Sequence, residues 1–343
     1  MNSIFLDTLN NKDTFRPPVW FMRQAGRILP SYQKIKKSYT FSQMMKNPDL
    51  AAKVTLLPID DLGVDAAILF SDILIVPEAL GMGLEFTAKG PLFDNPLTKY
   101  EKPSQALTKD LGKLDHVYKN IEKVVSVRKN DTPLIGFCGG PLTTFCFMFR
   151  GHVRDVTFND AIKFLYSNPK ESMKILDALV ETSIEYAQNQ VKHGIECFQL
   201  FETYGGLIPE DLYNEIFLPL SKKILNSVRD MGIPTIFFPK NFGNGLKYIN
   251  KDICDFVSVD WQANLYHSRK IIDKEVGIQG NIDPRLLYSD YTHIESELKK
   301  LIPFGQENQD WIINLGHGFL PDIDHKKAKF VVDWIKDTNW KRN

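Results

Sequence analysis

Short apolar runs recur along the whole chain, and they constrain the fold more than any other feature. Each run is mostly apolar without a clean alternation, and longer amphipathic segments separate the runs. Such runs are typical of strands that are buried on both faces, as in a parallel sheet. The candidate strands lie at residues 18–22, 66–70, 133–137, 196–201, 234–238, 256–260, 276–280 and 311–315.

Most of the segments between the runs predict helices. Residues 209–232 begin with Pro and two acids and end with Gly, which are helix start and stop signals. Residues 157–194 predict two consecutive helices with a break near Asn168 and Pro169. Residues 81–96 carry several Gly and Pro residues, which predicts a β-hairpin after the second strand instead of a helix.

Eight alternating strand–helix units favour a closed barrel. We therefore expect an α/β fold, a single-domain (β/α)8 TIM-type barrel over residues 1–343 with a short N-terminal lead at 1–16. A chain of this length fits one such domain. An open doubly wound sheet is the alternative, because the number of units does not separate the two folds.

Charge and cysteine content exclude several classes of protein. The chain has 42 basic and 42 acidic residues, so no global field attracts nucleic acid or an anionic membrane. It shows no secretory signal pattern and no apolar stretch long enough to span a bilayer, so we expect a cytoplasmic protein. Its four cysteines form no CxxC pair, and we expect buried, reduced thiols at Cys138, Cys146, Cys197 and Cys254.

Polar residues follow the candidate strands directly. In a barrel, active sites form at the carboxyl ends of the strands and in the loops that follow. These positions hold Arg23 and Arg27, Ser71 and Asp72, Cys138 to Pro141, Glu202 and Thr203, Lys240, Trp261, Asn281 and Asp283, and Gly316 to Gly318.

We call these positions after the strands the rim. Three features of the rim allow a functional or a structural interpretation. Arg23 and Arg27 would share one face of a helical turn and could bind carboxylates or phosphates, although a solvated basic loop fits equally well. Asp72 lies between apolar segments, as a functional carboxylate or as the cap of a turn. His317 lies between two glycines, which would let the backbone approach a ligand, but a structural histidine fits the same pattern.

Two segments resemble the signatures of the uroporphyrinogen decarboxylase family. They are PVWFMRQAGRILPSY at 18–32 and GFCGGPLT at 136–143. Further matches run in the expected order from about Pro17 to Asp322. They are AAILFSDILIVPEALGMG at 66–83, QLFETYGG at 199–206, QGNIDP at 279–284 and NLGHG at 314–318.

The resemblance implies a cofactor-free and metal-free barrel enzyme of tetrapyrrole and heme biosynthesis. Such an enzyme removes the four acetate carboxylates of uroporphyrinogen III and yields coproporphyrinogen III. The resemblance also implies a homodimer. By analogy Asp72 and Arg23 are catalytic, and the arginines hold substrate carboxylates while Asp72 accepts hydrogen bonds from pyrrole N–H groups. The residues implied to contact substrate are Arg23, Gln24, Ala25, Gly26, Arg27, Asp72, Phe147, Thr203 and His317.

One position departs from the family pattern. Phe147 stands where the alignment leads us to expect a tyrosine. Phenylalanine keeps the ring but loses a phenolic donor that would contribute about 1 kcal/mol of net hydrogen bonding. Tyr204 or a water molecule could take over that donor role.

Two other functions are compatible with parts of the pattern. A methyltransferase of the same superfamily would need zinc held by a His-x-Cys pair and a further Cys near the last strand. No His-x-Cys occurs, and neither 237–243 nor 314–318 contains a cysteine, which argues against such a zinc site. A tetrapyrrole-binding protein without catalysis is the second alternative, and Phe147 is its only support.

Overall fold

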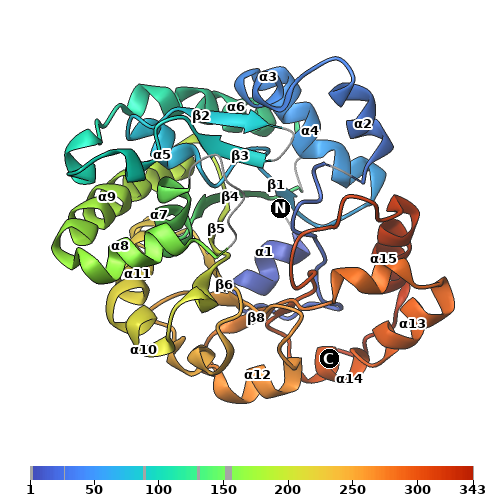
Figure 1. Cartoon of the computed structure of the whole chain (residues 1–343). Coiled ribbons are helices and arrows are strands. Elements are labelled where there is room, and N and C mark those ends of the chain that lie inside the picture. Colours follow the sequence, from blue (N-terminus) through green and yellow to red (C-terminus); the bar gives the residue numbers. More distant parts are fainter. Residues whose placement is uncertain (1–2, 27, 88–89, 130–131, 151–156, 343) are drawn as a thin grey trace.

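The structure is a computed structural model, and it describes residues 3–26, 28–87, 90–129, 132–150 and 157–342. Its centre is a curled parallel sheet of seven strands in the order β1-β4-β5-β6-β7-β8-β9, surrounded by helices (Figure 1). All neighbouring strands of this sheet are parallel. The strands are β1 (Ala67–Ile68), β4 (Leu134–Gly139), β5 (Cys197–Glu202), β6 (Thr235–Pro239), β7 (Phe256–Ser258), β8 (Gly277–Gln279) and β9 (Trp311–Ile312).

The strand prediction is confirmed for these seven strands. Each begins at the first or second residue of an apolar run, and every residue from β1 to β9 in this sheet is buried except one in β5. Burial on both faces explains why the runs are apolar without alternation.

The remaining run, 18–22, differs from the prediction of an eighth strand. Among the described residues it joins the sheet through a single parallel bridge between Val19 and Ile313. The Ile313 N–H donates to the Pro18 carbonyl at 2.9 Å, and the Asp65 N–H donates to the Val19 carbonyl at 2.8 Å. The segment therefore lies between β9 and the chain entering β1. Pro17 and Pro18 have no N–H to donate, which limits the ladder on this side.

Helices precede β1 and alternate with the later strands, and most of them surround the sheet, whereas α1 lies within the ring in Figure 1. Two of them, separated at Asn168, confirm the predicted break in 157–194. The helices are α1 (Ile4–Leu9), α2 (Pro30–Lys36), α3 (Phe41–Lys46), α4 (Pro48–Asp61), α5 (Ile75–Ala79), α6 (Asp115–Val127), α7 (Pro141–Phe149), α8 (Asn159–Ser167), α9 (Pro169–His193), α10 (Glu210–Leu212), α11 (Leu218–Arg229), α12 (Leu265–Ile271), α13 (Tyr291–Lys299), α14 (Ile302–Glu307) and α15 (His325–Asp337). A π-helical stretch, Tyr213–Phe217, joins α10 to α11 within the helical segment predicted at 209–232. No described helix is long and apolar enough to cross a membrane.

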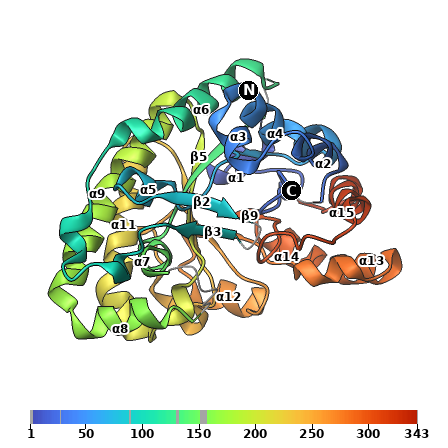
Figure 2. The same cartoon turned by 45° about the horizontal axis from the view of Figure 1, so that its top comes forward.

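A two-stranded antiparallel sheet lies between β1 and β4 along the chain, in the segment where a hairpin is expected. It consists of β2 (Leu84–Thr87) and β3 (Gly90–Phe93), and Figure 2 shows it outside the central sheet. Residues 88–89, which connect the two strands, lie outside the described residues. The Arg150 guanidinium donates to the Pro91 carbonyl at 2.6 Å, so β3 contacts the end of α7.

A buried polar network crosses the interior of the central sheet. The Trp20 Nε1–H donates to Gln279 Oε1 at 2.9 Å, and Gln279 Nε2 donates to Gln199 Oε1 at 3.2 Å and to Ser258 Oγ at 3.1 Å. These side chains are 0 % exposed. The network links segment 18–22 to β5, β7 and β8, and it helps to fix the segment that leads into Arg23.

Candidate active site

The loop that carries Arg23 is attached to the β9 side of the central sheet. Asn314 Oδ1 accepts from the Met22 N–H at 3.0 Å, and the Phe319 N–H donates to the Met22 carbonyl at 3.3 Å. Arg23 has a φ of 62° and an exposed side chain. A Cβ atom on Gly318 would lie 2.3 Å from Arg23 Cδ, so the glycine leaves space for the arginine stem beside His317.

The neighbouring residues of the first signature differ in their exposure. Gln24 is fully buried, with Nε2 donating to the Ala66 carbonyl at 2.8 Å and Oε1 accepting from the Phe21 N–H at 2.9 Å. Its side chain therefore fixes the loop to the chain entering β1. Ala25 is half-buried and Gly26 is buried, whereas Arg27 lies outside the described residues.

Asp72 lies in the loop after β1 and is half-buried. Its Oδ1 accepts a hydrogen bond from the Leu74 N–H at 2.9 Å. Burial raises the pKa of Asp72, while the Leu74 N–H and the positive charge of Arg23 act in the opposite direction. The positive charge of Arg23 thus acts on the carboxylate of Asp72, the other residue predicted to be catalytic.

An aromatic wall forms where α7 meets the end of β5. The Phe147 ring lies 5.9 Å from the Tyr204 ring and 5.2 Å from the Phe158 ring, between centroids. The Arg150 guanidinium carbon lies 4.3 Å from the centre of the Phe147 ring. Burial raises the pKa of Tyr204, whereas the charges of Arg150 and Arg23 lower it. Phe147 and Tyr204 thus form one half-buried surface, and the charge of Arg23 acts on Tyr204.

Thr203 and Glu202 occupy different environments although they are adjacent. Thr203 is half-buried and immediately precedes Tyr204 of the aromatic wall. Glu202 is 0 % exposed and accepts from the Leu142 N–H at 3.0 Å, the Thr143 N–H at 2.7 Å and the Thr143 hydroxyl. It caps the first turn of α7, the helix that carries Phe147. Burial raises the pKa of Glu202 to about 7, against these donors, which favour the carboxylate.

His317 packs against aromatic rings in the loop after β9. Its imidazole stacks on Trp261 with ring centroids 5.8 Å apart and an interplanar angle of 8°, and the Phe238 ring lies 6.3 Å away. Burial lowers the pKa of His317 to about 3, and the charges of Arg23 and Lys240 act in the same direction. The imidazole is therefore neutral at pH 7, and it can meet a ligand as a hydrogen-bond donor or acceptor but not as a cation.

Arg23 connects these groups, because its charge acts on Asp72, Tyr204 and His317 alike. The structure thus brings together predicted residues from the loop after segment 18–22, the loop after β1 and the loop after β9. It also adds Lys240 and Trp261, which the sequence places on the rim without a role. Their only sequence signal is their position directly after a candidate strand.

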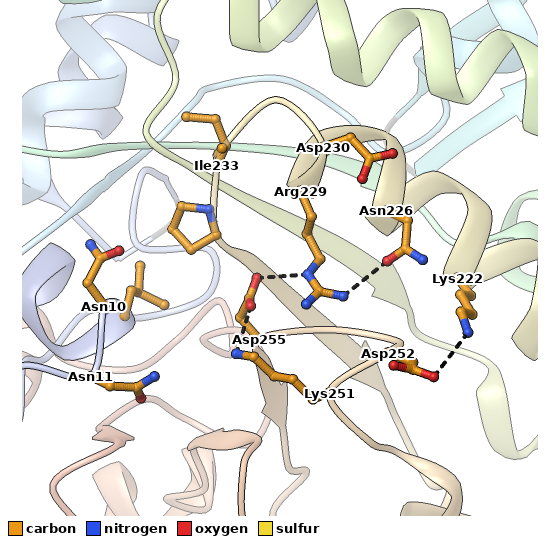
Figure 3. A pocket seen from close by; sticks show the side chains of 13 residues that line it. Asn10, Asn11, Lys222, Asn226, Arg229, Asp230, Ile233, Lys251, Asp252 and Asp255 are labelled. Atoms are coloured by element: carbon orange, nitrogen blue, oxygen red, sulfur yellow. Dashed lines mark hydrogen bonds and ion pairs between the residues drawn. The ribbon is translucent and has the colours of Figure 1, made fainter.

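A polar pocket of about 750 Å³ lies near the amino ends of β6 and β7, and Figure 3 shows its lining side chains. Pro234 and Asp255, which line it, immediately precede β6 and β7. Its lining holds three cations and three acids, and Asp255 binds Lys251 at 2.8 Å and Arg229 at 3.4 Å while Asp252 binds Lys222 at 3.7 Å. This pocket therefore has no surplus charge for an anion, and it lies away from the carboxyl ends of the strands, where barrel enzymes act.

The cysteines are buried, as expected for thiols in apolar surroundings. All four cysteines are buried and unpaired in the described part of the chain. Within the same residues, no group of three or more His, Cys, Asp or Glu side chains is arranged to hold a metal ion.

A comparison with known families decides the family of the chain. The family model described as uroporphyrinogen decarboxylase (URO-D) matches residues 1–338. The chain belongs to the uroporphyrinogen decarboxylase family. It is 37% identical over 340 residues to the uroporphyrinogen decarboxylase of Vesicomyosocius okutanii, covering 98% of both chains. It is 36% identical over 336 residues to that of Trichlorobacter lovleyi, again covering 98% of both.

Solved structures support the same architecture. A methyltransferase from Methanosarcina mazei matches with a TM-score of 0.79 at 18% identity, and the match covers 97% of both chains. At this identity the likeness concerns the fold alone. It supports an α/β fold built on a curled parallel sheet, and the family resemblance read from the sequence is confirmed by the family match.

Proposed function

We propose that this chain removes CO2 from the four acetate arms of uroporphyrinogen III to give coproporphyrinogen III, a step of tetrapyrrole and heme biosynthesis, without a cofactor. Full-length relatives at 36–37% identity are uroporphyrinogen decarboxylases. The site assignment is supported by the positions of Arg23 and Asp72, in the loops after segment 18–22 and after β1, and by the charge of Arg23, which lowers the pKa of Asp72. Both side chains come from the segments in which the sequence resembles the family.

Decarboxylation needs a place for the electron pair that the departing CO2 leaves behind. Cofactors such as pyridoxal phosphate usually provide it. A pyrrole ring can provide it instead. Protonation of the ring carbon next to the acetate-bearing carbon creates an iminium-like cation. The C–C bond to the carboxylate then breaks and its electron pair neutralises the ring. The exocyclic carbon takes up a proton to become a methyl group, and the ring carbon gives up the proton that it had gained, which restores the pyrrole.

Asp72 is suited to stabilise the ring cation in this sequence. One of its oxygens accepts from the Leu74 N–H, and the other would accept from pyrrole N–H groups. A fixed, half-buried carboxylate interacts more strongly with a developing positive charge than a solvated one, because little solvent rearranges around it. Its raised pKa reflects that desolvation.

Arg23 is suited to hold and orient a substrate carboxylate. Its planar guanidinium can form two parallel hydrogen bonds to one carboxylate, and such binding selects which acetate faces the reactive position. By analogy Arg23 is also a candidate proton donor, although a guanidinium is almost never deprotonated in proteins. If Arg23→Lys kept near-full turnover, the bidentate geometry would not be required.

The other predicted contacts complete the proposed site. Thr203 offers a hydroxyl to a carboxylate, neutral His317 offers an imidazole, and Phe147 gives the macrocycle an apolar wall. The backbone of Ala25 and Gly26 and the guanidinium of Arg27 remain predicted contacts. Gln24 acts by fixing the loop.

We also propose a cytoplasmic homodimer of a single-domain chain, without metal, nucleic-acid or membrane partners. Segment 18–22 would act as the frayed eighth strand of the (β/α)8 barrel, since it bonds to both Ile313 and Asp65. Light scattering of the purified protein tests the dimer, and a monomeric mass at micromolar concentration would contradict it.

An anaerobic assay with reduced uroporphyrinogen III and a metal chelator tests the activity. Products that lose carboxylates stepwise until four remain would support a metal-independent decarboxylase. Tight binding without product would instead identify a tetrapyrrole-binding protein. Activity that the chelator removes would contradict the proposed cofactor-free reaction.

A further inference from the structure

Lys240 lies at the carboxyl end of β6, and its backbone is fixed on both sides. Its N–H donates to the Glu202 carbonyl at 3.1 Å, and its own carbonyl accepts from the Gly206 N–H at 3.1 Å. The next residue, Asn241, has a φ of 58°, and its N–H donates to Asp260 Oδ2 at 2.7 Å. The side chain therefore projects from a rigid turn at the rim.

The ammonium group of Lys240 lies over an aromatic ring instead of a carboxylate. Its Nζ is 5.4 Å from the centre of the Trp261 ring, and the side chain is half-buried. Within the described residues, the ion pairs do not include Lys240, although neighbouring cations are paired. Arg285, also over Trp261, binds Asp283 at 2.7 Å.

The acid whose charge acts on Lys240, Asp260, forms no ion pair with it among the described residues. Asp260 uses Oδ2 for the Asn241 N–H and Oδ1 for the Gln262 N–H at 2.9 Å. Asp260 is 5% exposed and acts on Lys240 only through its field. A half-buried cation with no direct ion pair favours the binding of an anion from solution, because that anion would replace the hydration that burial removes.

Lys240 faces the same mouth as the proposed site. Trp261, under the ammonium group, is stacked on His317, and His317 lies within the fields of both Lys240 and Arg23. β6 and segment 18–22, which leads into Arg23, are separated by three strands (β7, β8 and β9) in the sheet order. Two cations thus flank one neutral imidazole from different sides of the barrel.

We propose that Lys240, supported by Trp261 and next to His317, is a second carboxylate-binding position that holds a peripheral carboxylate of the macrocycle. This inference rests on the proposed function, because it takes the substrate class from it. Arg23 and Lys240 would hold carboxylates on different arms and so fix the rotation of the ring above Asp72. Lys240 would accordingly contribute to substrate binding more than to the chemical step.

Replacement of the charge tests the proposal. The variant Lys240→Met removes the ammonium group while keeping an unbranched side chain. We expect about a tenfold rise in KM for uroporphyrinogen and in the Kd of oxidised uroporphyrin, which cannot react, with kcat within threefold of the wild type. Lys240→Arg should restore both constants to within about threefold, since it restores the charge.

The matched control removes a lysine of the following loop. Lys247 is exposed, binds Glu210 at 3.0 Å and lies over Tyr248, so Lys247→Met should leave KM and Kd within twofold of the wild type. Thermal unfolding of every variant shows whether it is folded. If Lys240→Met does not fold, Lys240→Gln replaces it as the variant without the charge, and Lys240→Arg remains the variant that keeps the charge.

The two kinds of substrate carboxylate can be separated by the ligand. Coproporphyrin carries propionates but no acetates. Weaker binding of both porphyrins by Lys240→Met would assign a propionate, and weaker binding of uroporphyrin alone would assign an acetate. An active wild type with unchanged KM and Kd in Lys240→Met would overturn the inference, whereas an inactive wild type would overturn the proposed function itself.

Discussion

Arg23 Cδ lies 2.3 Å from the position that a Cβ atom would take on Gly318. The two residues come from opposite ends of the chain, and they meet because segment 18–22 and β9 are adjacent through the bridge between Val19 and Ile313. The absence of a side chain at Gly318 therefore allows the position that the Arg23 side chain takes. A side chain there would leave the fold intact only if the Arg23 side chain moved.

Gly318→Ala should therefore act through Arg23. We expect kcat/KM for uroporphyrinogen to fall about 10- to 100-fold, because a displaced guanidinium misplaces the carboxylate it holds. In a double-mutant cycle, Gly318→Ala should have little further effect once Arg23 is replaced by alanine. Equal losses in both backgrounds would show that the glycine acts independently of Arg23.

Phe147→Tyr should increase activity. The Phe147 ring is half-buried beside Tyr204, and a hydroxyl on it would add the donor that the family pattern leads us to expect. A gain of about 1 kcal/mol corresponds to roughly a fivefold rise in kcat/KM. Steady-state kinetics of the two proteins checks this, with Phe158→Tyr as a control on the same wall. A fall in kcat/KM would show that the wall must be apolar.

The low pKa of His317, about 3, predicts a pH dependence of stability. The unfolded side chain titrates near pH 6.5. Between these values the unfolded state binds more protons, so the contribution of His317 to stability falls as the pH falls from about 6.5 toward 3. The free energy of unfolding of the wild type, relative to His317→Gln, should fall by on the order of 1 kcal/mol per pH unit there. A difference that stays constant with pH would contradict the prediction.

Gln279→Leu should lower stability by about 1–3 kcal/mol, because it removes both the acceptor of the Trp20 N–H and the donor to Gln199 in a fully buried network. Denaturant unfolding measures the change. Gln262→Leu, at an exposed position, is the control and should change the free energy of unfolding by less than about 0.5 kcal/mol. A cost no larger than the control would show that the network adds little to stability.

The sequence predicts the strands well because a strand that is buried on both faces is a short, continuous apolar run. Seven of the eight apolar runs are strands, whereas in the described part of the chain 18–22 pairs with the sheet through one bridge, at Val19. Its composition resembles that of the other runs, and its short pairing depends on the two prolines at its start and on the turn in which the Gln24 N–H donates to the Phe21 carbonyl at 3.0 Å. Such limits on hydrogen bonding are not visible in hydrophobicity alone.

The candidate site is less fully visible in the sequence. Arg23, Asp72 and His317 can be placed on the rim from their positions after apolar runs. The stacking of His317 on Trp261 and the burial of Gln24 depend on contacts between segments far apart in the chain, and no local pattern encodes them. Glu202 is a further example. Its position after a strand does not predict that its carboxylate caps α7.

The most direct test of the account compares the wild type with Asp72→Asn. Asparagine keeps an oxygen for the Leu74 N–H but removes the negative charge that we propose stabilises the ring cation. Single-turnover decarboxylation of uroporphyrinogen should be about 10²- to 10³-fold slower in the variant, while the Kd of oxidised uroporphyrin stays within about tenfold. A variant that binds the porphyrin and decarboxylates uroporphyrinogen at a rate within threefold of the wild type would contradict the central role of Asp72.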